Sequence, residues 1–426
     1  MRSLLASVVL LALAPACGDE GTVEGPGSVG RDGAVGDVFT LDAGSVDAGS
    51  PAWRSTGHQP AALIALEGMH LDDFALAGDQ LWAVGVAQAE AVVVAGPIGA
   101  APELSASQAL AGVDTSADSD AGGGALAARP PRLAAALYVR ASLATLVWRD
   151  DGNRLWLSDY DRRDGHLGDR DGSSVQGFGP AATTGAFVLM ERGGECGSVT
   201  RRCISVVAPG EAPNRRHTWA LPEQPPLGVS TTLSPLEMGE DGVRVTELST
   251  DRYAVIDPVV DDGTSRPVVI SLHAEDGEHL SRQWELELSS SHVHAMAASA
   301  DGGLLLAGAR VENGGALRGF VTRIGADGER AWEWLAEPGD GGSTVDALAL
   351  DSAGNVFTAS TEARGPDPLL IVRKLAPDGG PLWTYEHGEA RSDAVDVEVD
   401  GDDRAFVLAR VLEGETRGLL LRFDPE

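Results

Sequence analysis

Two histidines one residue apart, His292 and His294, are the first candidates for chemistry in this chain. Side chains alternate along a β-strand, so a strand would place both imidazoles on one side, where they could share a metal ion. No companion carboxylate or third histidine is identifiable beside them, and related stretches of the chain hold Ser or Asp at these positions. We therefore interpret the pair as the polar start of a strand, with metal binding as the less favoured alternative.

A second candidate is an acidic stretch that ends in a glycine. Asp159, Asp161 and Asp164 precede Gly165, and hard cations such as calcium prefer several oxygen ligands at close spacing. Arginines stand among these acids and break the register of a calcium loop. Solvated Asp-Gly turns are the favoured interpretation, calcium is the alternative, and no other cofactor is expected.

The third candidate is a pair of cysteines, Cys196 and Cys203, in a stretch rich in glycine. A loop or hairpin could bring them within bonding distance, and a zinc site would need two further ligands that are not nearby. In an exported protein such a pair favours a disulfide, which would staple two strands together.

Familiar catalytic motifs do not occur: there is no nucleophile elbow, phosphate loop or zinc helix. Acidic residues are numerous, so a glycosidase with paired carboxylates is not excluded by counting, but nothing singles out a pair. Tryptophans recur near the ends of related stretches and are predicted to serve packing rather than sugar binding; they are Trp53, Trp219, Trp284, Trp332 and Trp383.

These residues belong to units that repeat every 50 residues or so. Residues 345–359 and 369–384 form the clearest copy, and residues 295–306 repeat its first half. Each unit reads as strand, Asp/Gly turn, strand, variable loop, strand, Asp-Gly turn, strand, which is typical of propeller blades. The sequence predicts an all-β chain forming a single β-propeller of about seven four-stranded blades, with six or eight as alternatives.

The last unit lacks its fourth strand, because the chain stops after the stretch 419–424. The segment around Trp53 resembles the fourth strand around Trp383. We expect the Trp53 segment to pair with the strand that contains Leu420 and so close the ring, which would satisfy an open sheet edge.

The units resemble the bacterial β-propeller repeat family abbreviated SBBP. The shared patterns are the half at 346–359, which reads D-A-L-A-L-D-S-A-G-N from Asp346 to Asn355, and V-x-K-L-x-P-D-G at 372–379; the resemblance is clearest over 291–391. It implies the propeller fold. These motifs are structural and the family carries no fixed catalytic set, so the resemblance transfers no site residues.

The first residues resemble a bacterial lipoprotein signal, with an apolar run from Leu4 to Leu13 that ends at Cys17. Ala14 stands where such signals usually hold Leu, so an ordinary secretory signal is the alternative. We expect residues 1–17 to be the signal with Cys17 lipidated, residues 18–50 a disordered linker and residues 51–426 the propeller. The expected location is the outer membrane, facing the periplasm or the cell surface.

Charge and composition limit the function. The formal net charge of -32 repels nucleic acid, and no nucleic-acid partner is expected. The leading interpretation is a monomeric, non-enzymatic binding or scaffold lipoprotein whose loops meet a protein or glycan. The alternatives are a quinone-dependent or carbohydrate-active propeller enzyme, or an outer-membrane assembly factor. The enzyme alternative predicts ionisable side chains that converge from several blades in one deep pocket.

Overall fold

The computed structural model describes strands and tight turns between residues 58 and 425. Residues 1–57, 99–104, 115–123, 162–173, 221–243 and 259–267, a number of shorter loops and Glu426 lie outside the described part. Between residues 99 and 249 the description covers the backbone and the side chain of Ile204. The predicted signal, linker, Cys17 and Trp53 therefore lie outside the described residues.

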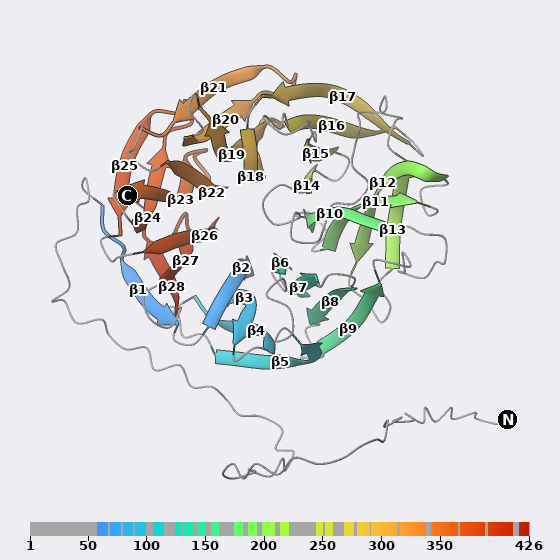
Figure 1. The fold of residues 1–426 in the computed structure, drawn as a ribbon, viewed down its shortest axis with the longest axis horizontal. Helices are drawn as coiled ribbons and strands as arrows, with labels where there is room; N and C mark the ends of the chain where they lie inside the picture. The colour runs from blue at the N-terminus through green and yellow to red at the C-terminus, as the bar shows by residue number, and fades with distance from the viewer. Residues whose placement is uncertain are drawn as a thin grey trace, which may run out of the picture. The chain divides into compact units, whose positions relative to one another are not determined.

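Every regular element in the described part is a β-strand, and the strands form seven antiparallel sheets of four (Figure 1). This confirms the prediction of an all-β chain of four-stranded units. The described residues form no helix, so that part of the chain contains no helix long and apolar enough to cross a membrane.

Six sheets keep their strands in chain order. The first three are β2 (Met69–Ala77), β3 (Gln80–Ala87), β4 (Glu90–Pro97) and β5 (Ser105–Asp114); β6 (Gly124–Arg129), β7 (Arg132–Val139), β8 (Leu143–Arg149) and β9 (Leu155–Asp161); and β10 (Ser174–Ala181), β11 (Ala186–Gly193), β12 (Ser198–Ala208) and β13 (Asn214–Ala220). The next three are β14 (Arg244–Ser249), β15 (Arg252–Pro258), β16 (Val268–Asp276) and β17 (His279–Leu288); β18 (Ser291–Ala298), β19 (Leu304–Val311), β20 (Leu317–Ile324) and β21 (Arg330–Leu335); and β22 (Ser343–Leu350), β23 (Val356–Arg364), β24 (Asp367–Leu375) and β25 (Pro381–Glu386).

The seventh sheet joins the two ends of the described chain. Its order is β1 (Ala62–Leu66), β28 (Arg417–Phe423), β27 (Ala405–Val411) and β26 (Ser392–Val399). Ile64 lies opposite Leu420, and Leu66 opposite Gly418. An N-terminal strand does pair with the Leu420 strand, but it is Ala62–Leu66 and not the Trp53 segment. The apolar run of β1 explains the choice, because Ile64 and Leu66 are both buried.

Position within a sheet decides how apolar a strand is. The second strand β19 is buried along most of its length, and its sequence Leu-Leu-Leu-Ala-Gly-Ala is almost continuously apolar. The fourth strand β21 begins with exposed residues and is buried only in part. A strand covered on both faces needs an apolar run, whereas an outer strand tolerates charge.

The recurring Asp-x-Gly turns have a physical cause. In the turn before β25, Asp378 Oδ1 accepts the backbone N–H of Gly380 at 3.0 Å, and Gly379 adopts φ 86°. In the turn before β21, Asp327 accepts from Glu329 at 3.0 Å, and Gly328 adopts φ 87°. A carboxylate that bonds its own backbone two residues on, followed by a residue at positive φ, makes a tight hairpin turn.

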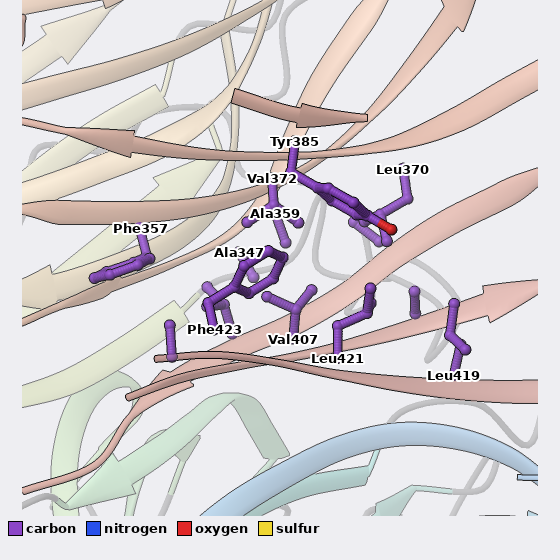
Figure 2. Packing of buried hydrophobic residues seen from close by; sticks show 14 of the residues in the cluster. Ala347, Phe357, Ala359, Leu370, Val372, Tyr385, Val407, Leu419, Leu421 and Phe423 are labelled. Carbon is purple, nitrogen blue, oxygen red and sulfur yellow. The ribbon is translucent and has the colours of Figure 1, made fainter. Parts of the chain in front are cut away.

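The space between sheets is filled by aromatic and branched side chains. Figure 2 shows the cluster between the β22–β25 and β26–β28 sheets, where Phe357, Tyr385 and Phe423 pack with Val407 and Leu421. All of these side chains are almost completely buried. Removal of such apolar surface from water is the main force that holds one sheet on the next.

Two tryptophans lock neighbouring sheets together. Trp284 of β17 donates its indole N–H to Ala326 O at 3.1 Å, and Trp332 of β21 donates to Pro377 O at 2.8 Å. Each indole therefore reaches the Asp-Gly turn of the following sheet. These tryptophans serve packing, as their recurrence predicted.

One sheet carries buried ion pairs. Lys374, the sole lysine of the chain, lies with its Nζ 3.1 Å from Asp351 Oδ2, and Arg373 lies 2.6 Å from Glu362. All four side chains are less than 10 % exposed. Such pairs are costly to break one partner at a time, because the other charge stays buried.

The sheets meet mainly through their first strands. Contacts join β2 with β6, β6 with β10, β10 with β14, β14 with β18, β18 with β22, β22 with β26 and β26 with β2. This packing is consistent with a propeller-like arrangement. It also brings the side chains of neighbouring first strands close to one another.

Candidate functional site

The first strand of several sheets carries a bulge at the same place in the repeat. The pairing register shifts between Val293 and Ala295 in β18, and between Val345 and Ala347 in β22, so His294 and Asp346 are the extra residues. In β26 the extra residue is Val395. A bulge re-aims the side chain it carries, and bulges are common beside active sites.

The two bulge residues of β18 and β22 contact each other. His294 Nδ1 lies 3.3 Å from Asp346 Oδ1. The same carboxylate accepts hydrogen bonds from Thr344 Oγ1 at 2.7 Å and from Thr361 Oγ1 at 2.6 Å. Asp346 is therefore fixed by three groups and orients one nitrogen of the His294 ring.

A second group of ionisable side chains lies on β26, β27 and β2. Asp393 of β26 is the cross-strand partner of Arg410 in β27. Arg410 Nη1 is 2.9 Å from Nε2 of His70, on the first strand of the neighbouring sheet. A guanidinium can only donate, so His70 Nε2 is the acceptor in this contact.

Asp393 has a pKa above its ordinary value. Burial is the largest cause, since it disfavours the charged carboxylate, and the negative charge of Asp346 acts in the same direction. The positive charges of Arg410 and Arg391 oppose the shift in part. Asp346 and Asp393 also lie near each other in the fold, because Thr361 Oγ1 bonds both Asp346 Oδ2 and the backbone N–H of Ala394, the residue after Asp393.

Further carboxyl groups lie along β26 and β2. Burial raises the pKa of Asp396 to about 6, against hydrogen bonds with Asp73 and with backbone N–H groups. Burial and the charge of Asp396 raise the pKa of Glu398 to about 8. The backbone N–H of Val397 donates to Asp396 Oδ1 at 2.8 Å, which fixes that carboxyl group. Asp396 and Glu398 therefore stay protonated to a higher pH than carboxyl groups ordinarily do.

We call His70, His294, Asp346, Asp393 and Arg410 the ionisable cluster. Its members come from β2, β18, β22, β26 and β27, which belong to four different sheets. A carboxyl group with a raised pKa can donate a proton, and an imidazole held by a fixed carboxylate can accept one. The cluster therefore has the components of general acid–base catalysis.

The sequence candidates have different outcomes. His294 lies in the cluster, but its contact is the carboxylate of Asp346. His292 is two residues earlier on β18, opposite Ala309. Within the part of the chain that the structure describes, no three His, Cys, Asp or Glu residues are grouped to hold a metal ion.

The remaining candidates lie in the N-terminal half or beyond the described residues. Asp159 and Asp161 are in β9, near its end, and Asp164 is outside the described part. Cys203 is in β12 opposite Glu191, whereas Cys196 falls outside. The disulfide and the calcium alternative remain predictions.

Sequence reasoning missed His70, Asp346, Asp393 and Arg410. A signal was present, because the repeat that aligns Ala295 with Ala347 also aligns His294 with Asp346. Polar residues that differ between copies of a structural repeat mark positions where packing does not dictate the side chain. Reading those positions across copies would have found part of the cluster.

No family model matches the chain, and no curated protein matches it. Among solved structures, the polysaccharide lyase Uly1 is similar with a TM-score of 0.48 and 8 % identity, over 84 % of this chain and 90 % of that one. An ulvan lyase, described as a new polysaccharide lyase family PL25, is similar with a TM-score of 0.42 and 9 % identity, over 86 % of this chain and 95 % of that one. Similarity at this level carries no residue, substrate or mechanism over to this chain. The resemblance to SBBP repeats stays a prediction.

The interpretation as a non-enzymatic binding or scaffold protein is wrong as the leading one. Ionisable side chains from four sheets come together, which is the convergence that the enzyme alternative expected. The sequence lacked familiar catalytic motifs because its acid–base groups are spread over separate repeats.

Proposed function

We propose that this chain is a carbohydrate-active enzyme that cleaves glycosidic bonds by acid–base catalysis at the ionisable cluster. The observation that carries the proposal is the convergence of ionisable side chains from four sheets, in which His294 contacts Asp346, Arg410 contacts His70, and burial raises the pKa of Asp393. Cleavage of a glycosidic bond needs a proton donor for the leaving oxygen and a second group that accepts a proton or stabilises charge. The proposed substrate class, a polysaccharide, is also the class on which the two lyases act by name.

Each residue has a distinct role in this proposal. Asp393 donates the proton to the leaving oxygen, because its pKa is raised by burial. His294 accepts a proton, from the attacking water in hydrolysis or from the carbon beside a uronic carboxylate in a lyase reaction. Asp346 orients the His294 ring as a carboxylate orients a catalytic histidine. Arg410 holds His70 and offsets the negative charge that develops near Asp393.

The proposal includes the finer architecture. We infer a single seven-bladed propeller in which first strands surround a central axis and β1 completes the last blade. The series of first-strand contacts that runs from β2 to β26 and returns to β2 supports this ring, as does the pairing of β1 with β28. In such a ring the ionisable cluster lies at the axis, where a polysaccharide chain can reach it.

Export as a lipoprotein through Cys17 is also a proposal, supported by the apolar run before that cysteine. It suits an enzyme that acts on large glycans, which do not enter cells. A Cys17→Ser variant should lose membrane association in cell fractionation, and retention in the membrane fraction would contradict lipidation.

The test is a screen of the purified protein against neutral and acidic polysaccharides. Release of reducing ends reports any glycosidic cleavage, and ultraviolet absorbance of unsaturated uronic acid separates a lyase from a hydrolase. On a cleaved glycan, Asp393→Asn and His294→Ala should each lower kcat/KM by about 100-fold or more. The control Glu337→Gln changes an exposed carboxylate outside the cluster and should leave the rate unchanged. Full activity in Asp393→Asn, or no cleavage of any glycan, contradicts the proposal.

A further inference from the structure

One position in the second strand of two adjacent sheets reaches across to the next sheet. Thr361 in β23 lies opposite Thr344, and Arg410 in β27 lies opposite Asp393, so both occupy the same place relative to the bulge. Arg410 bonds His70 of the following sheet. Thr361 likewise bonds a first strand of the following sheet, β26.

The Thr361 hydroxyl makes two hydrogen bonds at once. It donates to Asp346 Oδ2 at 2.6 Å and accepts the backbone N–H of Ala394 at 3.0 Å. A hydroxyl has one proton to donate and lone pairs that can accept, so these two bonds satisfy both its donor and an acceptor site. Ala394 directly follows Asp393, the proposed proton donor.

We propose that Thr361 is a positioning residue that sets the distance between Asp346 and Asp393. Thr361 bonds the Asp346 carboxylate directly, and it holds Asp393 through the backbone N–H of the next residue, Ala394. The catalytic part rests on the proposed function, whereas the link between β22 and β26 is a property of the folded chain alone. Thr361 itself touches no substrate in this proposal.

The expected consequence follows from the precision that acid–base catalysis needs. Without the hydroxyl, Asp346 loses a donor and the Ala394 N–H loses its acceptor, so the two first strands are no longer tied at this point. Displacement of a catalytic group by an ångström costs on the order of 100-fold in rate. A residue outside the ionisable cluster thereby controls its geometry.

The experiment uses variants of the whole chain that differ by a hydroxyl. Thr361→Val keeps the shape and removes the link, and Thr361→Ser restores a hydroxyl. Thr358→Val is the matched control on the same strand, because Thr358 Oγ1 is buried and has no hydrogen-bond partner among the described residues. Thr344→Val removes another donor to Asp346 and leaves the Ala394 bond in place.

The first readout is hydrogen–deuterium exchange of the Ala394 amide, which needs no substrate. Exchange should be about 10-fold faster in Thr361→Val, the factor expected for one hydrogen bond, and unchanged in Thr361→Ser, Thr358→Val and Thr344→Val. Should Thr361→Val not fold, Thr361→Cys, a weak hydrogen-bonding group, should give an intermediate increase.

The second readout is the rate on a cleaved glycan. Thr361→Val should lower kcat by about 10-fold or more with KM unchanged, alter the pH profile and be rescued by Thr361→Ser. Unchanged Ala394 exchange in Thr361→Val overturns the link whatever the activity. Faster exchange with wild-type kcat and pH profile overturns the positioning role. Faster exchange in a protein that cleaves no glycan supports the link and contradicts the proposed function instead.

Discussion

Two contacts between neighbouring sheets solve the same packing problem in different ways. Where the β18–β21 sheet meets the β22–β25 sheet, Trp332 donates to Pro377 O and lies against the turn at Gly379. Where the β22–β25 sheet meets the seventh sheet, the equivalent indole is Trp383. In the seventh sheet the fourth strand is β1, from the other end of the described chain, so no hairpin turn joins it to its neighbour β28.

The missing turn changes the chemistry around Trp383. His58 stacks on the indole with ring centroids 4.7 Å apart, and Phe423 lies 5.3 Å away. The buried Nε1 of Trp383 has no hydrogen-bond partner among the described residues. Completion of this sheet by a strand from the other end of the described chain therefore replaces a hydrogen bond by aromatic packing. An unpaired buried N–H costs about 1–3 kcal/mol.

The contribution of β1 gives the largest expected effect. Leu66 is fully buried and packs in the cluster that contains Phe74 and Phe406. Leu66→Ala should lower the free energy of unfolding by about 3 kcal/mol, measured by urea denaturation. Leu382→Ala, on the exposed side of β25, should change it by less than about 0.5 kcal/mol. Equal losses would mean that β1 does not contribute to the core of the seventh sheet.

The pH dependence of stability tests the contact between β26 and β2. The pKa values of Asp396 and Glu398 are raised from 3.8 and 4.5 in the unfolded reference to about 6 and about 8. The folded state therefore binds more protons than the unfolded state. The contribution of this proton binding to the free energy of unfolding is fully present below about pH 4 and is lost as the pH rises to about 8. The free energy of unfolding should fall by about 2 kcal/mol or more across this window.

Glu398→Gln separates this effect from other titrations. An amide cannot ionise, so the variant should be more stable than the wild type near pH 8 and show a flatter pH dependence. Glu337→Gln, an exposed carboxylate elsewhere, should keep the wild-type profile. A wild-type stability that rises steadily over this window would show that these carboxyl groups are ionised in the fold.

The smallest effect separates backbone strain from the indole contact. Gly379 and Gly354 both have positive φ, at 86° and 79°. A Cβ at Gly379 would lie 2.8 Å from Trp332, whereas one at Gly354 meets only Pro377 at 3.8 Å. Gly379→Ala should therefore cost about 1 kcal/mol more than Gly354→Ala in thermal unfolding. Equal costs would show that the indole moves aside freely.

Much of the fold follows from the sequence because the same turn and packing residues recur in successive sheets. The turn chemistry of Asp378-Gly379 and the indole of Trp332 recur with the period of the sheets, so the pattern predicted four-stranded units. The closing strand was misplaced because the match of Trp53 to Trp383 outweighed the plain apolar run Ala62–Leu66. A short fully apolar strand carries no distinctive signal of its own.

The candidate site was less predictable for a physical reason. Asp346, Asp393 and His70 are each unremarkable within their own repeat and gain their properties from neighbours in other sheets. Their association depends on how the first strands pack, which the local sequence does not encode. His294 was noticed, but its partner was hidden in the next copy of the repeat.

The buried Lys374 has a practical consequence. Reagents that attack side-chain amines find their single target shielded in the folded protein, beside Asp351 and over the ring of Phe357. Acylation of that amine can proceed only when β24 separates from its surroundings. The rate at which Lys374 Nζ is acylated therefore reports how often the β22–β25 sheet opens.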